Sequence, residues 1–202
     1  MTQKIANPAP LGLMGFGMTT ILLNIHNAGY FPIDSMILAM GIFFGGIAQI
    51  IAGIMEYRNG NTFGTTAFTS YGSFWLTLVG LILMPNMEIG VAGSPHHFMG
   101  WYLSLWGLFT GFMFIATLAN YPRAKQFIFG SLTVLFFLLA ARDFTGSALL
   151  GTIAGFEGIV CGASAVYLAM ATIINGEYGR TIMPIGELKR PAAAQANVAM
   201  AH

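Results

Sequence analysis

Hydrophobic residues fill six long stretches of the sequence, and polar residues gather mainly in the short gaps between them. Each stretch approaches the length of about 20 residues that an α-helix needs to cross the hydrocarbon core of a bilayer. The pattern therefore predicts six membrane-spanning helices joined by connections too short to form a further domain. The expected spans are 9–29, 34–56, 62–84, 97–120, 122–141 and 147–174.

The composition strengthens the assignment to the membrane. Hydrophobic residues make up 56% of the chain and charged residues only 7%, and the mean hydropathy is +0.72. A soluble domain of this size would carry many more charged residues on its surface. We therefore expect an all-α, multi-pass protein of the cell (inner or plasma) membrane, with a six-helix transmembrane domain over residues 1–186. Residues 187–202 are expected to form a disordered cytoplasmic tail.

The basic residues predict the orientation of the helices. With six crossings both termini lie on one side, and that side holds every Lys and Arg except Arg142. Because Lys and Arg favour the cytoplasmic side, both termini are expected in the cytoplasm. A removable signal peptide ending near Gly29 would leave five crossings and break this pattern, and we do not expect one. The residues on the basic side are Lys4, Arg58, Arg123, Lys125, Arg180, Lys189 and Arg190.

Several classes of function find no support in the sequence. The net charge of +1 and the absence of basic runs argue against nucleic-acid binding. The single Cys161 excludes an internal disulfide. No His pairs face each other inside helices, and no set of His, Cys and carboxylates has the spacing of metal ligands. We also find no nucleotide-binding loop and no nucleophile–base pair, so neither a cofactor nor an enzyme activity is expected.

Small residues repeat at intervals of three and four in two of the stretches, which places them along one face of a helix. Helices in lipid need such residues for close backbone approach. The stripes are therefore expected to pack helices together within the bundle. The alternative is that part of this surface packs one subunit against another. The sixth stretch carries Gly151, Gly155, Gly158, Gly162, Ala165 and Ala169, and the second carries Gly41, Gly45, Ala48 and Ala52.

Polar residues form stripes in the other helices. Ser and Thr can return a hydrogen bond to their own helix, so a Ser/Thr stripe has a purely structural explanation. Asn24 and Gln49 do so less easily, and an unpaired amide in hydrocarbon is costly. We therefore expect this polar set to pair between helices or to line a solute path. Its members are Thr20, Asn24 and Asn27, then Gln49, and then Thr62, Thr66, Thr69, Ser70, Ser73 and Thr77.

Glu157 is the one carboxylate well inside a predicted crossing. Because an ionised acid in the membrane is costly, its side chain is expected to face the protein interior. It is either a proton-binding site or a neutral acid hydrogen-bonded between helices. Glu56 lies instead at a helix end beside Arg58, where a surface ion pair is the simpler expectation.

Long motifs in four of the helices resemble the acetate uptake transporter family. The likeness extends over about residues 4–187, nearly the whole chain, and is weakest at 85–97, at 141–147 and in the final tail. The motifs are NPAPLGL at 7–13 followed by GFGMTT, GGIAQIIAG at 45–53, EYRNGNTFGTTAFTSYGSFW at 56–75, CGASAVYLAM at 161–170 and RTIMPIGE at 180–187.

This resemblance implies a homo-oligomer, a hexamer in known members, in which each protomer passes acetate through its own six-helix bundle. It also implies a narrow apolar constriction, and the matching positions in this sequence are Phe16, Tyr71 and Leu132. Ala165 matches a position that lines the path and influences the size of the solute. The path-lining residues expected from the polar stripes, from the helix start and from the resemblance are Asn7, Thr20, Asn24, Gln49, Thr66, Ser70 and Ala165.

These assignments agree with elementary chemistry. Asn7 with Pro8 and Pro10 is typical of a helix start, whose free N–H groups and positive dipole suit a carboxylate. A ring of bulky apolar side chains would exclude hydrated ions and still pass a small solute with a methyl group. The hydroxyl of Tyr71 is expected to guide the carboxylate.

The function expected is therefore transport of acetate and related small carboxylates, with succinate as a further solute. Passive anion flow and proton-coupled symport would use the same lining, and Glu157 is the candidate proton site. A membrane sensor or scaffold that moves no solute is the remaining alternative, although the short loops offer it little surface for a partner.

Overall fold

The computed structural model describes residues 5–87 and 89–188, and every regular element within them is a helix. In chain order they are α1 (Ala9–Asn27), α2 (Ser35–Met40), the π-helix η1 (Gly41–Ala48), α3 (Gln49–Arg58), α4 (Thr62–Leu83), the 3₁₀-helix η2 (Met84–Asn86), α5 (His96–Asn120), α6 (Arg123–Thr145) and α7 (Ala148–Tyr178).

The described residues contain six helical segments that are long and apolar enough to cross a membrane, which confirms the predicted number of spans. The elements α2, η1 and α3 join into one segment, and η2 prolongs α4. The last two segments run four residues further than predicted, to Thr145 and Tyr178. Each of them ends at a glycine in the left-handed region, Gly146 (φ +68°) and Gly179 (φ +60°), a common way to terminate a helix.

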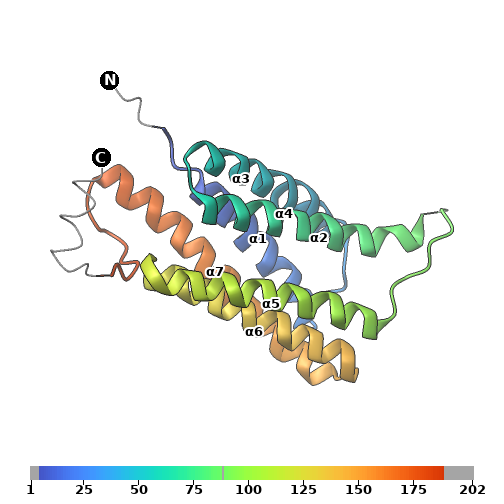
Figure 1. The fold of residues 1–202 in the computed structure, drawn as a ribbon. Coiled ribbons are helices and arrows are strands. Elements are labelled where there is room, and N and C mark those ends of the chain that lie inside the picture. The colour runs from blue at the N-terminus through green and yellow to red at the C-terminus, as the bar shows by residue number, and fades with distance from the viewer. Residues whose placement is uncertain (1–4, 88, 189–202) are drawn as a thin grey trace.

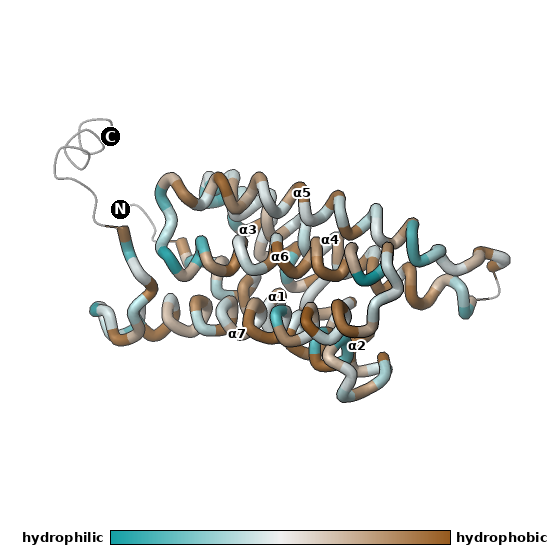
Figure 2. The backbone as a smooth tube through the Cα atoms, turned by 90° about the horizontal axis from the view of Figure 1, so that it is seen from below, coloured by the Kyte–Doolittle hydropathy of each residue, from teal (hydrophilic) through white to brown (hydrophobic). Residues whose placement is uncertain are grey.

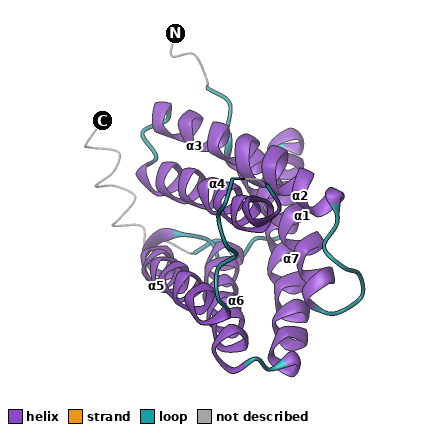
Figure 3. Ribbon diagram, turned by 90° about the vertical axis from the view of Figure 1, so that its right-hand side faces the viewer, coloured by secondary structure: helices purple, strands orange, loops and turns teal. Residues whose placement is uncertain are grey.

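The helices follow one another around the bundle (Figures 1 and 3). The segment from α2 to α3 pairs with α4, α5 pairs with α6, and α7 packs against both α6 and α1. Helix α1 has its most extensive interface with α7 and also touches η1 and α3. The starts of α1, α4 and α6 lie at the same end of the bundle as the end of α7, and we call this the terminal end.

Glycines set the close approach of α1 and α7. A Cβ atom on Gly17 would lie 2.7 Å from the carbonyl oxygen of Gly162, and a Cβ on Gly162 would lie 2.7 Å from that of Gly17. Further along α7, Gly158 leaves room for the side chain of Asn24. This part of the small-residue stripe of the sixth stretch therefore packs against α1 inside the subunit.

A π-helix interrupts the second span where it passes α1. A Cβ on Gly15 would meet the carbonyl oxygen of Phe44 at 2.6 Å, so η1 and α1 are in backbone contact. Gly45 leaves room for Thr19 and for the indole of Trp75, because a Cβ on Gly45 would lie 2.9 Å from an atom of each. The glycines of the second stretch thus hold α1, η1 and α4 together.

The segment after α7 folds back onto the start of α6. The carbonyl of Gly186 accepts a hydrogen bond from the N–H of Arg123 (2.9 Å), and that of Ile185 accepts one from Ala124 (3.0 Å). These bonds satisfy two of the N–H groups that the first turn of a helix leaves free. Residues up to Gly186 are therefore part of the bundle, and the expected tail lies, from residue 189 onward, outside the described residues.

The outward face of the bundle is apolar. Large hydrophobic side chains such as Phe43, Phe112 and Leu149 are 65–69% exposed in the single chain. Hydrophobic residues run along the helices, and hydrophilic stretches gather toward the ends of the bundle (Figure 2). This distribution is typical of a protein whose surroundings are lipid or further membrane-embedded protein.

Candidate functional site: two cavities that meet at an aromatic ring

Two cavities lie inside the bundle, one beyond the other. The first, which we call the Lys125 cavity, is lined by residues that include Lys125, Glu56 and Gln49, and several of its lining residues lie at the starts of α1, α4 and α6, toward the terminal end. The second, the Trp75 cavity, is lined by residues that include Trp75 and Thr20. Among the described residues, three side chains line both cavities: Phe16, Tyr71 and Leu132.

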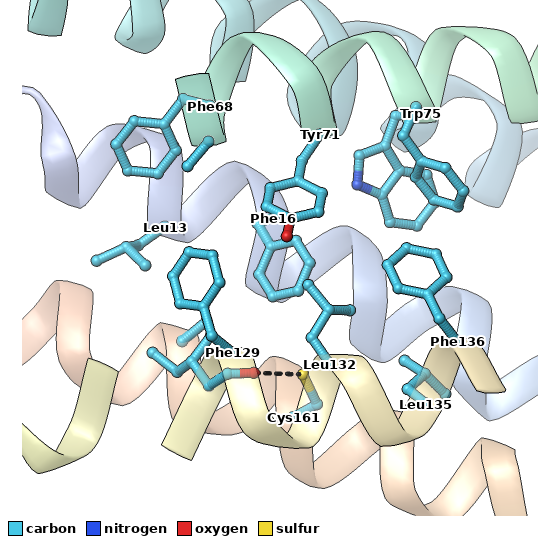
Figure 4. Packing of buried hydrophobic residues seen from close by; sticks show 14 of the residues in the cluster. Leu13, Phe16, Phe68, Tyr71, Trp75, Phe129, Leu132, Leu135, Phe136 and Cys161 are labelled. Atoms are coloured by element: carbon cyan, nitrogen blue, oxygen red, sulfur yellow. Dashed lines mark hydrogen bonds between the residues drawn. The ribbon is translucent and has the colours of Figure 1, made fainter. Parts of the chain in front are cut away.

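These three shared residues come from α1, α4 and α6, and all of them are buried. The ring centroids of Phe16 and Tyr71 are 6.1 Å apart. Figure 4 shows Leu132 beside this pair, with Phe129 on the one side and Phe136 on the other. The junction of the two cavities is therefore a collar of apolar side chains from three helices.

The hydroxyl of Tyr71 is engaged with a neighbouring helix. It donates to the Oγ1 of Thr110 on α5 (3.0 Å), and Thr110 in turn donates to the carbonyl of Trp106 (2.7 Å). The tyrosine proton is thus committed within the protein, so it is the ring of Tyr71 that lines the cavities. The expectation that its hydroxyl guides a carboxylate finds no support in this geometry.

Lys125 supplies a cation beside the first cavity. Its Nζ lies 3.9 Å from the ring centroid of Tyr121 and 4.9 Å from that of Phe63. Burial, and then the negative charge of Glu56, raise the pKa of the Tyr121 hydroxyl, so this ring stays neutral. Within the described chain Lys125 forms no ion pair, and the two aromatic faces hold its ammonium in place.

Glu56 lies inside the protein and is 3% exposed. Its Oε2 accepts a hydrogen bond from the Nδ2 of Asn61 (2.7 Å), and the Oδ1 of Asn61 accepts one from the N–H of Gly64 at the start of α4. The expected surface ion pair with Arg58 is wrong. The turn from α3 into α4 directs the carboxylate inward, so that it lines the Lys125 cavity and caps this turn.

Polar groups continue into the second cavity. The Nδ2 of Asn24 donates to the carbonyl of Thr20 (2.9 Å), and its Oδ1 accepts from Asn27 (3.0 Å). Asn27 also accepts a bond from Arg142 (3.4 Å), which is paired with the buried Asp143 at 2.8 Å. A chain of hydrogen bonds thus links the cavity wall to the charges at the far end of the bundle.

The structure brings together only part of the expected path set. Thr20 and Asn24 line the Trp75 cavity, and Gln49 lines the Lys125 cavity. Asn7 is exposed and accepts a hydrogen bond from the N–H of Ala9 (3.0 Å), whose side chain lines the Lys125 cavity. Three other members of the set line neither cavity: Thr66 is exposed, Ser70 is half-buried, and Ala165 is fully buried in the apolar core.

Glu157 also lies off the two cavities. It projects from α7 toward α6, where its Oε1 accepts a hydrogen bond from Ser131. Its Oε2 is buried without a partner among the described atoms. The carboxyl therefore faces the protein interior, as the sequence predicted, at the interface of α6 and α7.

Two side chains of the cavities had no signal in the sequence. Lys125 is one basic residue among several at a predicted helix end, and Trp75 is one aromatic residue in an apolar stretch. Their contacts in the folded chain distinguish them from similar residues. Lys125 lies against the rings of Tyr121 and Phe63, and Trp75 packs on the glycines of η1.

Six apolar helices around two internal cavities define a multi-pass membrane protein. Residues 1–189 match the GPR1/FUN34/yaaH family, and the chain belongs to that family.

Named relatives and one solved structure cover nearly the whole chain. The succinate-acetate/proton symporter SatP of Escherichia coli K12 is 63% identical over 185 residues, which are 91% of this chain and 97% of that protein. Acetate permease A of Emericella nidulans is 34% identical over 200 residues, 91% of this chain and 66% of the permease. A solved structure described as the bacterial acetate channel SatP superposes with a TM-score of 0.88 at 62% identity, over 91% of this chain and 100% of the other. These relatives are transporters and channels by name.

Proposed function

We propose that this protein carries acetate and other small carboxylates, succinate among them, across the cell (inner or plasma) membrane. The observation that carries the proposal is that Phe16, Tyr71 and Leu132 line both cavities. A solute that moved between the cavities would pass these three side chains. The names of the relatives agree with this class of solute.

The lining suits a solute that has a charged end and an apolar end. The Lys125 ammonium and the start of α1 attract a carboxylate, and the apolar collar accepts a methyl group while it disfavours hydrated ions. The path in this proposal runs from the Lys125 cavity, at the cytoplasmic end, through the collar and into the Trp75 cavity. Residues 1–186 form the transport domain, and 187–202 a cytoplasmic extension.

The test is acetate flux in liposomes that contain the purified protein, with the pH gradient and the membrane potential set independently. Acetate is mostly ionised at neutral pH, because carboxyl groups of this kind have a pKa between about 4 and 5. Passive anion flow follows the potential, and proton symport follows the pH gradient. Absence of any acetate flux, from a protein that unfolds cooperatively, would favour the sensor or scaffold alternative.

The two names given to the relatives differ on mechanism, since one protein is called a proton symporter and the other a channel. If uptake is coupled to protons, Glu157 is the carboxyl we expect to carry the proton, because it lies well inside a membrane span, its Oε2 is buried without a partner among the described atoms, and it has no ion pair of the kind that Asp143 forms with Arg142. Glu157→Gln keeps the hydrogen bond to Ser131 and removes the titration. Symport through Glu157 predicts acetate uptake that no longer responds to the pH gradient, whereas an unchanged response assigns Glu157 a structural role.

A further inference from the structure

The segment after α7, which carries the motif RTIMPIGE at 180–187, is fastened to the bundle by its backbone, and we call it the strap. Asn175, in the last turn of α7, holds its first part. The Oδ1 of Asn175 accepts hydrogen bonds from the N–H groups of Ile182 (2.7 Å) and Met183 (2.9 Å), and its Nδ2 donates to the carbonyl of Met183 (2.8 Å). One side chain thus fixes two consecutive residues of the strap.

The strap then crosses from α7 to the start of α6 (Figure 1). The hydroxyl of Tyr167, about two turns before Asn175, donates to the carbonyl of Pro184 (2.7 Å). The next two carbonyls accept the bonds from the first turn of α6 that are described above. Every residue from 182 to 186 therefore has a backbone group bonded to α7 or to α6, which an extension lying loosely on the surface would not have.

Gly186 fits the strap to α6. Its φ of +69° lies in the left-handed region, and a Cβ atom at this position would lie 2.7 Å from the Cβ of Arg123. A larger residue would be strained here and would also push against Arg123. Beside it, Ile185 is partly buried against the apolar core. The end of the strap is therefore shaped to the start of α6.

This contact lies next to Lys125 and to the ring that supports it. The guanidinium of Arg123 donates to the Oε1 of Gln126 (2.7 Å), and the Nε2 of Gln126 donates to the carbonyl of Tyr121 (3.0 Å). The Lys125 ammonium in turn lies over the ring of Tyr121. Arg123 thus connects the strap both to the lysine, two residues further along the helix, and to the aromatic support of that lysine.

The first turn of α6 depends on the strap for its hydrogen bonds. Pro122 precedes the helix and provides no side-chain cap. Free N–H groups at a helix start need partners, and here the carbonyls of the strap take the place of a cap. Without these carbonyls the first turn would fray, and Lys125 belongs to that turn.

We propose that the strap holds the first turn of α6 in place and thereby sets the position of the Lys125 ammonium at the terminal end of the solute path. Asn175 and Gly186 are then positioning residues, because neither lines a cavity and both act on the solute through Lys125. The effect of the strap on transport rests on the proposed function, whereas its effect on the lysine does not.

Amine labelling measures the position of the lysine. The chain has three lysines, Lys4, Lys125 and Lys189, so brief treatment with a small amine-reactive ester followed by mass spectrometry gives a labelling rate for Lys125 relative to Lys4 in the same molecule. Asn175→Leu removes three bonds of the strap, and the rate is expected to rise about fivefold, which corresponds to the net value of one hydrogen bond. Gly186→Ala acts at the other end of the strap and is expected to give a rise of the same order.

Thr172→Val is the matched control. Thr172 lies one turn before Asn175, and its hydroxyl returns a bond to the carbonyl of Leu168 in the same helix (2.7 Å), so it takes no part in the strap. The labelling rate of Lys125 is expected to stay at the wild-type value. Tyr167→Phe removes a single strap bond and replaces Asn175→Leu if thermal unfolding shows that the latter does not fold.

Flux in liposomes then measures the consequence for the solute. Asn175→Leu is expected to raise the KM for acetate about threefold at unchanged kcat, less than removal of the charge would, because a displaced ammonium still attracts a carboxylate. In a protein that already carries Lys125→Met, Asn175→Leu should add nothing further. A residue that only stabilised the bundle would act equally in both proteins.

Each arm has a result that overturns the inference. Unchanged labelling of Lys125 in both Asn175→Leu and Gly186→Ala, or an equal rise in Thr172→Val, would show that the strap does not hold the lysine. A KM effect of Asn175→Leu that persists in the Lys125→Met protein would show that Asn175 acts elsewhere, and the transport function would stand. If the wild-type protein carries no acetate, the proposed function fails, and the labelling rates still decide the role of the strap.

Discussion

Three side chains form the junction of the two cavities. The collar combines two aromatic rings, which burial and the Tyr71–Thr110 bond hold in place, with one leucine that is free of polar contacts. Leu132 is the collar residue that can be shortened without removing an aromatic contact or a hydrogen bond.

Leu132→Ala is expected to widen the collar and to favour larger carboxylates. One methylene group in an apolar pocket changes discrimination by about tenfold or more, and propionate is longer than acetate by one methylene group, so flux of propionate relative to acetate should rise by about this factor. Competition between labelled carboxylates in liposomes measures it. Val134→Ala on the exposed face of α6 is the control, and a Leu132→Ala protein with wild-type solute preference would remove Leu132 from the collar.

Lys125→Met is expected to weaken capture of the carboxylate at the terminal end. The ammonium lines its cavity without an ion-pair partner in the described chain, so its charge is available to a solute. Loss of a bond to a charged group corresponds to a rise in KM of about tenfold, with a smaller effect at high salt. Initial uptake rates at several acetate concentrations test this, with Lys125→Arg as the variant that retains the charge.

At the scale of the helices, glycine contacts hold together the helices that line the two cavities. Helix α1 carries Phe16 and Thr20, and it is clamped between α7 and η1 by backbone contacts at Gly17 and Gly15. A membrane offers little hydrophobic driving force between helices, so this close approach supplies much of the attraction. The position of the collar therefore depends on glycines that line neither cavity.

Gly162→Ala is expected to lower the stability of the bundle. The added Cβ would lie 2.7 Å from the carbonyl oxygen of Gly17, and overpacking of this kind costs about 1–3 kcal/mol. Gly176→Ala is the matched control on the same helix, because its added Cβ would have no atom within 4 Å apart from its own stretch of helix backbone and its chain neighbours. Thermal unfolding in detergent compares the two variants, and equal midpoints would show that α1 and α7 are not packed as described.

At the scale of the whole molecule, the single chain leaves a polar stripe on its surface. Thr66, Ser73 and Thr77 of α4 are exposed, although their helix crosses the membrane. Ser73 and Thr77 return hydrogen bonds to their own helix, which makes them tolerable in lipid. A second protein surface would cover Thr66 better than lipid does, which agrees with the homo-oligomer implied by the resemblance.

The expected assembly is a hexamer, and its mass tests this directly. Native mass spectrometry from mild detergent should give six times the 21.6 kDa of one chain. Thr66→Leu together with Ser73→Leu would make the stripe apolar and is expected to weaken the association, while Leu105→Ala on exposed α5 serves as a comparison. A monomer in every detergent tested would contradict the assembly, and the path through each subunit would remain.

The class of fold follows from the amino-acid sequence alone. Six apolar stretches of membrane-spanning length leave little alternative to helices, because a backbone in hydrocarbon must satisfy its hydrogen bonds internally. The spacing of Gly158 and Gly162 also predicted a packing face, since helical periodicity places residues three or four apart on one side. Resemblance of the motifs to a known family predicted a constriction at Phe16, Tyr71 and Leu132. The role of these residues in transport stays a prediction.

The packing of the helices determines which polar residues line a cavity. Periodicity states which residues share a helix face, but the neighbouring helices decide whether that face is internal. Thr20 and Gln49 line the cavities, whereas Thr66 is exposed, although all three belong to similar polar patterns. Lys125 and Trp75 became notable only through contacts with residues distant in sequence. Such contacts depend on how whole helices pack, which no local pattern encodes.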